Sequence, residues 1–509
     1  NPANRNGTGD GLAEMMLGLA AGGTVGNENG ENLWTNSLSA FVQDDWKVTP
    51  NLTLNLGVRY DIFYAPTFPD GRVSTFEVDF NNTGPNARLK QIRFDKGACN
   101  CDNDFNNIAP RVGFAWRATK KTVVRAGAGV IFARADSLQT QWARGQNQAP
   151  DFVEIGFGTL DRITPRLTLS GGFPAVTLPA TEVPGPAAVG IDAPQRSMPA
   201  QYSQQWFFDV QRELPLDTLL TVGYAGNGTR QMPVGVNFNI PFNIQPSSTP
   251  IAATRLWPFY TAVNRQQAMA NLSYNALLTK VEKRFSKGLT YILAYTWSHT
   301  IDNADEVGNN DGVGVLKPWD RSVNRGNALT DVRHNFVMSG TYELPFGRGR
   351  TYLANTHRAV DAILGGWQIG GIFSRTSGLP YTVSTGGGLT NAGGADRPNR
   401  LRDGGLPADQ RTIDRWFDVS AFTPQPQYTY GNSGRNILFG PRLSNLDFSI
   451  AKFFQLTEKA RLQFRAESFN STNTPYFGLP NANISGLGPG TITSAGEPRR
   501  IQFGLKFLF

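Results

Sequence analysis

The sequence is poor in the side chains from which most catalytic and metal sites are built. It has three histidines, His299, His334 and His357, and two cysteines, Cys99 and Cys101. A hydrolytic triad needs a nucleophile, a base and an orienting acid, and a tetrahedral metal site needs four ligands. The two cysteines, one residue apart, are too few for a disulfide framework and are interpreted as a loop detail, with a small strained ring as the alternative. No GxSxG, HExxH or GxxxxGK[ST] motif occurs, so we expect no catalytic residue, no metal and no cofactor.

Long apolar runs are also missing. Mean hydropathy is −0.31, and no stretch approaches the roughly 18 apolar residues of a membrane-spanning helix. Spanning strands remain possible because their two faces average to neutral hydropathy. Charged residues make up 17% of the chain, below the roughly 25% of globular proteins. The net charge of +8 comes from basic residues spread singly, which argues against a nucleic-acid partner and leaves a positive lumen as one interpretation.

Apolar and polar side chains alternate in stretches of about ten residues, the pattern of strands with two different faces. In the segment 51–61, Leu54 and Val58 share one face while Asn55 and Arg59 share the other. About thirteen such stretches are predicted: 35–47, 51–61, 109–118, 121–134, 202–213, 217–227, 274–286, 288–300, 332–344, 366–376, 444–455, 459–467 and 500–509.

The predicted strands are joined alternately by short and long connections. The long ones run over about 63–108, 135–201, 228–273, 301–331, 377–443 and 471–499. Outer-membrane barrels have short periplasmic turns and long extracellular loops, and structureless loops of this length are uncommon in compact soluble domains. One connection on the short-turn side is longer, and its residues 355–364 are expected to form a short helix.

Two features of the predicted strands favour a membrane barrel over a soluble sandwich. Aromatic residues recur near strand ends, as in the girdles of membrane barrels: Trp46, Trp116, Trp206, Trp297, Trp367, Tyr60, Tyr224, Tyr295 and Tyr342. The polar face carries full charges, which a dry core would not tolerate: Arg59, Arg125, Arg333, Arg461, Arg465, Asp209, Asp447 and Glu467.

The C-terminus has the ending typical of bacterial outer-membrane barrels, which the barrel-assembly machinery reads. Its last strand places a row of apolar side chains on one face and ends on an aromatic residue. The predicted assembly signal consists of Ile501, Phe503, Leu505, Phe507 and Phe509.

Several motifs together resemble the barrel of Oar-like TonB-dependent receptors. They include SLSAFVQDDWKVTPNLTLNLGVRYD (37–61), NNIAPRVGFAW (106–116), DVRHNFVMSGTYELPFG (331–347) and RLQFRAESFNSTNTPYFG (461–478). The resemblance covers nearly all of residues 35–509. It implies an all-β, antiparallel transmembrane barrel in the bacterial outer membrane, with about 13 of a probable 22 strands present here.

The resemblance also implies parts that this sequence does not show: a plug, a TonB box and often an N-terminal carboxypeptidase-regulatory-like domain. Residues 1–34 are expected to be a loop or partial helix before the first strand. They lack an initiator Met and a signal peptide, so we expect that the chain begins partway through a longer precursor. Thirteen strands alone would leave two open edges, which lipid does not tolerate. The expected partners are outer-membrane lipid, the TonB complex through the missing N-terminal segment, and the barrel-assembly machinery.

Substrate contacts in this class of receptor come from the plug apex, the loops and the upper lumen. By this resemblance the candidate residues are the lumen arginines Arg59, Arg125 and Arg333 and the loop aromatics Trp257 and Tyr260. The competing interpretation, which we favour for the arginines, is that they pair with lumen carboxylates.

The leading hypothesis for function is uptake or sensing of a substrate at the cell surface, the substrate being an oligosaccharide, a peptide or a metal chelate. A structural, adhesion or signalling role is the alternative, because long loops suit protein contacts. A soluble all-β binding protein is the third hypothesis, and it predicts recovery without detergent.

Overall fold

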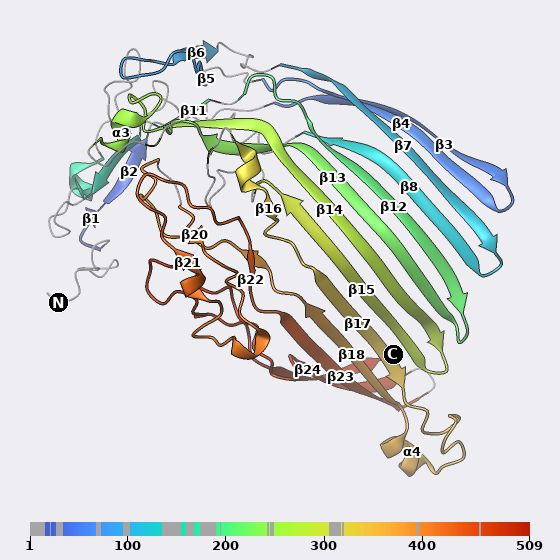
Figure 1. The fold of residues 1–509 in the computed structure, drawn as a ribbon. Coiled ribbons are helices and arrows are strands. Elements are labelled where there is room, and N and C mark those ends of the chain that lie inside the picture. The colour runs from blue at the N-terminus through green and yellow to red at the C-terminus, as the bar shows by residue number, and fades with distance from the viewer. Residues whose placement is uncertain are drawn as a thin grey trace.

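Thirteen long strands form one continuous antiparallel meander in the computed structural model, and each pairs with the long strand that precedes or follows it along the chain (Figure 1). Two short strands join this path to make a sheet of 15 strands. The long strands are β3 (Ser37–Thr49), β4 (Leu52–Phe63), β7 (Asp104–Thr119), β8 (Thr122–Ala133), β12 (Gln201–Leu214), β13 (Thr218–Asn237), β14 (Ala262–Ser286), β15 (Leu289–Asp302), β17 (His334–Glu343), β18 (Trp367–Thr376), β23 (Leu443–Gln455), β24 (Arg461–Phe469) and β25 (Arg500–Leu508). Every predicted strand is present, which confirms the antiparallel partial barrel.

The structure describes only part of the loop regions. The described residues are 16–20, 22–26, 34–67, 73–94, 102–134, 154–158, 167–173, 190–193, 195–241, 244, 249–304, 317, 320–392, 396–457 and 460–509. Cys99 and Cys101 lie outside them, as does most of the segment 1–34. Among the described residues, no helix is long and apolar enough to cross a membrane.

The smaller elements lie in the connections. The short strands are β1 (Leu19–Ala20), β2 (Gly22–Gly26), β5 (Val73–Glu77), β6 (Lys90–Phe94), β9 (Glu154–Gly158), β10 (Leu167–Thr168), β11 (Gly190–Asp192), β16 (Gly326–Asn327), β19 (Pro380–Tyr381), β20 (Asn399–Arg400), β21 (Phe422–Thr423) and β22 (Leu438–Phe439). The α-helices are α3 (Ile251–Thr254) and α4 (Arg358–Leu364), and the 3-10 helices are η2 (Leu169–Gly171), η3 (Arg321–Asn324), η4 (Ala408–Gln410) and η5 (Val419–Ala421). The expected helix near 355–364 is therefore confirmed as α4.

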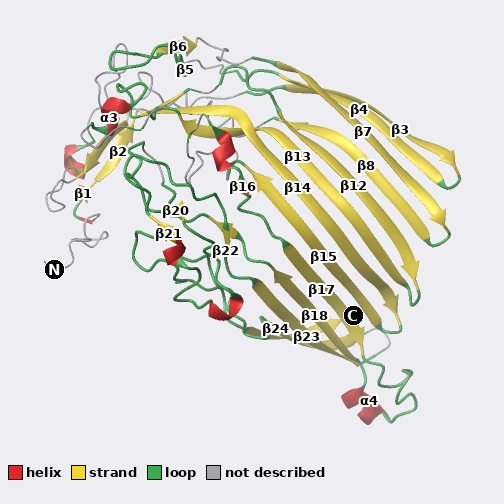
Figure 2. Ribbon diagram, viewed as in Figure 1, coloured by secondary structure: helices red, strands yellow, loops and turns green. Residues whose placement is uncertain are grey.

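Long and short connections lie at opposite ends of the strands (Figure 2). The loop segments gather at one end, here called the loop end. The other end carries tight turns, such as the turn at Lys120–Lys121 between β7 and β8, and also carries α4. This alternation follows the prediction and matches the extracellular and periplasmic ends of membrane barrels.

The strand register sorts side chains onto two faces. Across β7, β8 and β12, Trp116 lies beside Val124 and Val210, whereas Ala115 lies beside Arg125 and Asp209. The first row belongs to the apolar face and the second to the polar face of the sheet. All nine aromatic residues assigned to girdles fall on the apolar face, as a membrane barrel requires.

The apolar face is exposed rather than covered by another layer. On β25 the side chains of Phe503 and Leu505 are 73% and 69% exposed. A stack of large apolar side chains across neighbouring strands makes a continuous apolar surface, and such a surface is stable only against another apolar medium.

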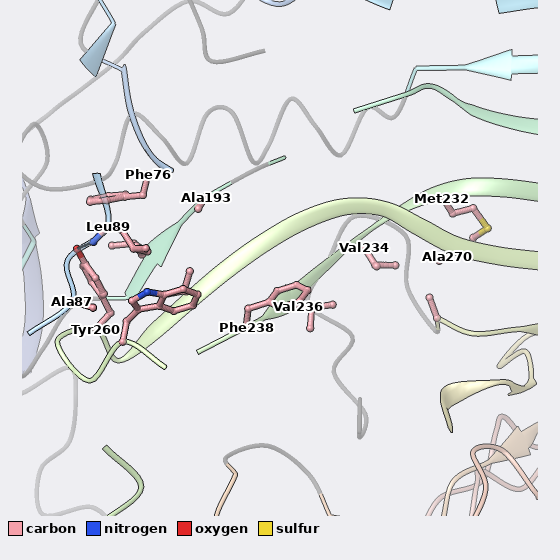
Figure 3. Close-up of a cluster of buried hydrophobic side chains, with 14 residues drawn as sticks. Phe76, Ala87, Leu89, Ala193, Met232, Val234, Val236, Phe238, Tyr260 and Ala270 are labelled. Carbon is pink, nitrogen blue, oxygen red and sulfur yellow. Dashed lines mark hydrogen bonds between the residues drawn. The ribbon is translucent and has the colours of Figure 1, made fainter. Parts of the chain in front are cut away.

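The strands β13 and β14 extend beyond their neighbours at the loop end and carry a core of their own (Figure 3). The prediction treated 228–273 as a loop, but β13 continues to Asn237 and β14 begins at Ala262. A bulge between Thr229 and Met232, with Gln231 at a φ of 58°, interrupts the ladder before it resumes. The bulge breaks the alternation in the sequence, which explains why the extension was not predicted.

Two apolar clusters order the loop end. The first cluster comprises Phe76, Ala87, Leu89, Ile191, Ala193, Met232, Val234, Val236, Phe238, Trp257, Tyr260, Val263, Ala270 and Ala304. The second cluster comprises Tyr381, Val383, Phe417, Ala421, Phe422 and Leu438. Because each cluster joins segments far apart in the sequence, the loop residues that belong to it are packed against one another.

Candidate functional site

The polar face of the sheet holds a recess at mid-strand, and this recess is the candidate functional site. It has a volume of about 830 Å³. The recess exists because several side chains on this face are single hydrogen atoms: Gly57 on β4, Gly113 on β7, and Gly127 and Gly129 on β8. Register makes these glycines near neighbours, since Gly113 is paired with Gly127.

Polar groups surround the glycine floor. Arg111 stands beside Gly57 and Gly129, and Arg125 stands one row nearer the short-turn end, opposite Asp209. Both arginines are exposed, and Arg125 interacts electrostatically with the carboxylate of Asp209. Amide side chains complete the rim: Gln43, Asn55, Gln205 and Asn227.

Aromatic rings enclose the recess on the side of β12 and β14. The ring of Phe207 lies over Gly127, so close that a Cβ atom at Gly127 would approach the ring to 2.7 Å. Tyr274 lines the recess from β14. Guanidinium groups, amides and aromatic rings around one hollow suit a ligand that carries an anionic or hydroxyl-rich group.

Arg59 is already engaged on the polar face. Its Nε lies 2.8 Å from the Asp61 carboxylate, which also accepts a hydrogen bond from Ser39. Asp61 is buried, with 4% of its surface exposed. Arg59 therefore neutralises a buried carboxylate, which is the arrangement that the competing interpretation anticipated for the lumen arginines.

Arg333 lies immediately before β17 at the loop end and is part of a hydrogen-bonded network. Its Nε lies 2.6 Å from a carboxylate oxygen of Asp331, and its terminal nitrogen lies 2.8 Å from His299 Nε2 and 3.0 Å from Asn327 Oδ1. Asp331 is fully buried and accepts a hydrogen bond from the backbone amide of Thr300. These hydrogen bonds connect the segment that precedes β17 to β15, so Arg333 stabilises the structure at this point.

Trp257 and Tyr260 are buried, with 0% and 3% of their surfaces exposed. The indole Nε1 of Trp257 donates to the carbonyl of Asn82, and Asn239 bonds the backbones of both aromatic residues. Figure 3 shows the cluster to which these residues belong. In this structure the two rings hold loops together and do not face solvent.

A second group of buried charges fastens the loop 377–443 over the end of β15. Arg435 pairs with Asp302, and the side chains of the pair are 2% and 6% exposed. The Arg435 guanidinium also donates to the carbonyl of Asn324 at 2.7 Å. Asn436 and Asn327 exchange side chain to backbone hydrogen bonds at 2.8 Å in both directions.

Burial in this loop also changes the ionisation of its tyrosines. Desolvation raises the pKa of Tyr381 far above its ordinary value, and the nearby Arg411 offsets only part of this rise. Desolvation also raises the pKa of Tyr430, with a further rise from the negative charge of Asp396. Both phenols therefore stay protonated to a higher pH than an exposed tyrosine does.

The predicted assembly signal lies on the last strand of the sheet. Ile501, Phe503, Leu505 and Phe507 project from the apolar face of β25 beside β24. Phe503 stacks on Phe464 with ring centroids 6.2 Å apart, and Phe507 contacts Phe509 at 5.8 Å. The arrangement matches the predicted alternation, while recognition by assembly machinery stays a prediction.

No group of three or more potential metal-ligating His, Cys, Asp or Glu side chains occurs in the part of the chain that the structure describes. Of the predicted binding residues, only Arg125 lines the recess. Arg111, Phe207 and the glycines of the floor were missed. A signal was present in the sequence, because Gly57, Gly113 and Gly127 occur where the alternation places polar-face residues.

The sequence profile of the family described as outer membrane beta barrel domain matches residues 1–502. Three solved structures are similar in fold. The ferripyoverdine receptor of Pseudomonas aeruginosa is 11% identical with a TM-score of 0.43, over 94% of this chain and 39% of that one. The FrpB iron transporter from Neisseria meningitidis is 10% identical with a TM-score of 0.43, over 93% and 45%.

The outer membrane transporter YddB from Escherichia coli is 7% identical with a TM-score of 0.45, over 94% of this chain and 54% of that one. The chain thus spans between 39% and 54% of the length of these three structures. The comparison with curated proteins finds no match.

Proposed function

The chain belongs to the outer membrane beta barrel domain family, and from this premise we propose that it forms a large part of the wall of a TonB-dependent transporter that takes up or senses a substrate at the cell surface. The protein lies in the bacterial outer membrane, with its apolar face against lipid. The polar face then lines the lumen of a barrel that, as the resemblance of its motifs implies, has 22 strands and a plug.

The recess on the polar face carries this proposal. A wall that served only to close a barrel would be expected to fill its polar face with paired side chains, as Arg59 and Asp61 do. Instead, four glycines open a hollow that Arg111 and Arg125 border. We propose that these two arginines contact an anionic group of the passing substrate, with the rim amides bonding its hydroxyl or carbonyl groups.

The first test is deletion of the gene in the native host, with growth measured on peptides, oligosaccharides or ferric chelates as the limiting nutrient. Uptake predicts a defect on one nutrient class, and loss of TonB function should reproduce the same defect. Normal growth on all three classes would contradict the transport proposal.

The second test addresses the recess within the complete protein. Each of the substitutions Arg111→Gln and Arg125→Gln removes a charged hydrogen-bond donor, worth about 1.5–3 kcal/mol, so uptake at limiting substrate should fall at least about tenfold. The matched control is Arg465→Gln, because Arg465 is a polar-face arginine that lies 2.8 Å from Glu467. Equal effects of all three substitutions would remove the recess from the mechanism.

An adhesion or signalling role is the second candidate, and the packed loop end favours it. The two apolar clusters give the described loops a defined shape, which suits recognition of a surface partner. Crosslinking from the loop 377–443 to a surface protein, together with normal growth of the deletion strain on every nutrient, would support this candidate over transport.

A further inference from the structure

The connection between β17 and β18 differs from the other described turns at the short-turn end. Elsewhere two strands are joined by a few residues, whereas here residues 344–366 separate them and include α4 (Figure 1). A tight turn would suffice to join two antiparallel neighbours. The additional residues therefore call for another physical reason.

This connection is ordered by its own contacts. The rings of Phe346 and Tyr352 pack with centroids 5.6 Å apart, and the amide of Gly347 donates to the carbonyl of Tyr352 at 3.0 Å. The amide of Arg348 donates to the Asp361 carboxylate at 2.7 Å. The helix is thus held to the first part of the connection and presents a fixed surface.

The helix exposes apolar side chains on one side. Val360, Ile363 and Leu364 are 39%, 68% and 47% exposed. Their spacing of three and four residues places them on one face of a helix. Ala362 lies on the opposite face, because it follows Val360 by two residues, or about 200° of helical rotation.

The end of the helix abuts the apolar face of the sheet. The indole Nε1 of Trp367 donates to the carbonyl of Ile363 at 2.9 Å. By register Trp367 lies beside Lys452, on the same face as Ile369 and Ile450. The Lys452 ammonium donates to the carbonyl of Gly365 and lies 4.8 Å from the centre of the Trp367 ring. The apolar stripe of α4 therefore lies next to the apolar, lipid-facing side of the sheet, at the position of Trp367.

The charges of this connection favour an anionic surface. Residues 344–366 contain Arg348, Arg350 and Arg358 against one carboxylate, Asp361. Arg350 pairs with Glu343 at 2.9 Å. The side chains of Arg348 and Arg358 are exposed, and neither makes an ion pair with a described residue. A short helix with an apolar stripe on one face and an arginine on the opposite, polar face has the composition of helices that lie in a lipid headgroup layer.

We propose that α4 is a membrane foot: its stripe of Val360, Ile363 and Leu364 inserts into the headgroup region of the periplasmic leaflet of the outer membrane, and the positive charge of Arg348 and of Arg358, on the polar face of the helix, favours the anionic phospholipid surface. The foot extends the lipid contact of the barrel beyond its strands. It sets the depth and tilt of β17 and β18 in the membrane, because Trp367 and Lys452 connect the helix to the wall.

The test measures depth residue by residue in the complete protein, reconstituted in nanodiscs of phosphatidylethanolamine and phosphatidylglycerol. A small fluorophore is attached to Ile363→Cys in a background that also carries Cys99→Ser and Cys101→Ser. Quenching by a headgroup nitroxide lipid is then compared with quenching of the same label at Ala362→Cys. We expect at least threefold stronger quenching at position 363 than at position 362, because position 363 belongs to the apolar stripe, whereas position 362 lies about 100° around the helix from it and about 200° from Val360.

Equal quenching at the two positions would overturn the proposal. The proposal would also be overturned if lipid nitroxides did not quench the label at position 363 and only the addition of a periplasmic extract shielded it from solvent. The apolar stripe would then bind a protein and not lipid. A further variant, Ile363→Ser with Leu364→Ser and the label at Val360→Cys, should lose lipid quenching. Its barrel should keep the heat-dependent migration of a folded barrel on gels, which separates loss of the foot from loss of the fold.

Discussion

The buried pair of Arg435 and Asp302 leads to the sharpest stability prediction for the loop end. Replacing Arg435 by Met keeps much of the side-chain volume but removes the guanidinium that pairs with the Asp302 carboxylate, which is 6% exposed. Breaking a buried pair by removing one partner costs about 3–5 kcal/mol, because an uncompensated charge stays buried. The hydrogen bond from Arg435 to the carbonyl of Asn324 is lost as well.

The cost falls on opening of the loop 377–443 and not on the membrane sheet, because Arg435 joins this loop to the end of β15. A loss of about 3 kcal/mol raises the open fraction about 150-fold, at 1.4 kcal/mol for each factor of ten. Hydrogen exchange of amides in peptides covering 396–443 measures this opening directly. We expect their exchange to accelerate by about two orders of magnitude, while peptides from β15 and β17 keep their protection.

The control is Arg402→Gln in the same loop. Arg402 lies 2.7 Å from Asp418 but is 53% exposed, and a pair so accessible to water contributes about 1 kcal/mol or less. The double variant Arg435→Met with Asp302→Asn should recover much of the protection, because no charge then remains buried. The reasoning fails if Arg435→Met and Arg402→Gln accelerate exchange equally, or if the double variant exchanges faster than Arg435→Met.

Three further predictions follow from other contacts. Trp257 has 0% of its surface exposed, and its replacement by Ala should destabilise the first apolar cluster by about 3–5 kcal/mol. We expect rapid proteolysis within 73–94 in this variant, whereas the control variant Trp34→Ala, at an exposed position, should stay resistant. Hydrogen bonds from Ser420 and then Arg402 lower the pKa of Asp418 below its ordinary value of 3.8. The ionised Asp418 therefore stabilises the folded loop fully above pH 3.8, and this stabilisation is lost as the pH falls through the lower pKa of the folded state. A Ser420→Ala variant should accordingly lose its protection from hydrogen exchange at a higher pH than the unchanged protein. Deleting Phe509 should reduce the heat-modifiable, membrane-inserted fraction in cells, whereas Leu487→Ser, at a position 97% exposed, should leave it unchanged.

The sheet could be predicted from the sequence because strand alternation is a local property. The side chain of every second residue points the same way, so the contrast of Leu54 with Asn55 already assigns two faces before any pairing is known. The connection lengths then imply the up-and-down order. The prediction failed where the local rule is interrupted, at the bulge beside Gln231, and the extension of β13 and β14 was missed there.

The site was less predictable because its geometry depends on cross-strand neighbours. Arg59 and Arg125 have the same pattern in sequence, yet Asp61 pairs with the first and a recess adjoins the second. Arg111 was missed, since its importance comes from glycines on other strands. Trp257 and Tyr260 were expected to face a substrate, but only the packing of 73–94 and 190–193 against β13 and β14 buries them.

The sequence by itself determined the strands, their two faces and the membrane setting, because each depends on residues two positions apart and on composition. Only the tertiary structure decided which charges are paired, where the wall is hollow and how the loops are closed. Arg435 and Asp302 are 133 residues apart, and an interaction over such a separation has no local pattern. The chain must first be ordered by the sheet before these groups can meet, lose their water and acquire a defined role.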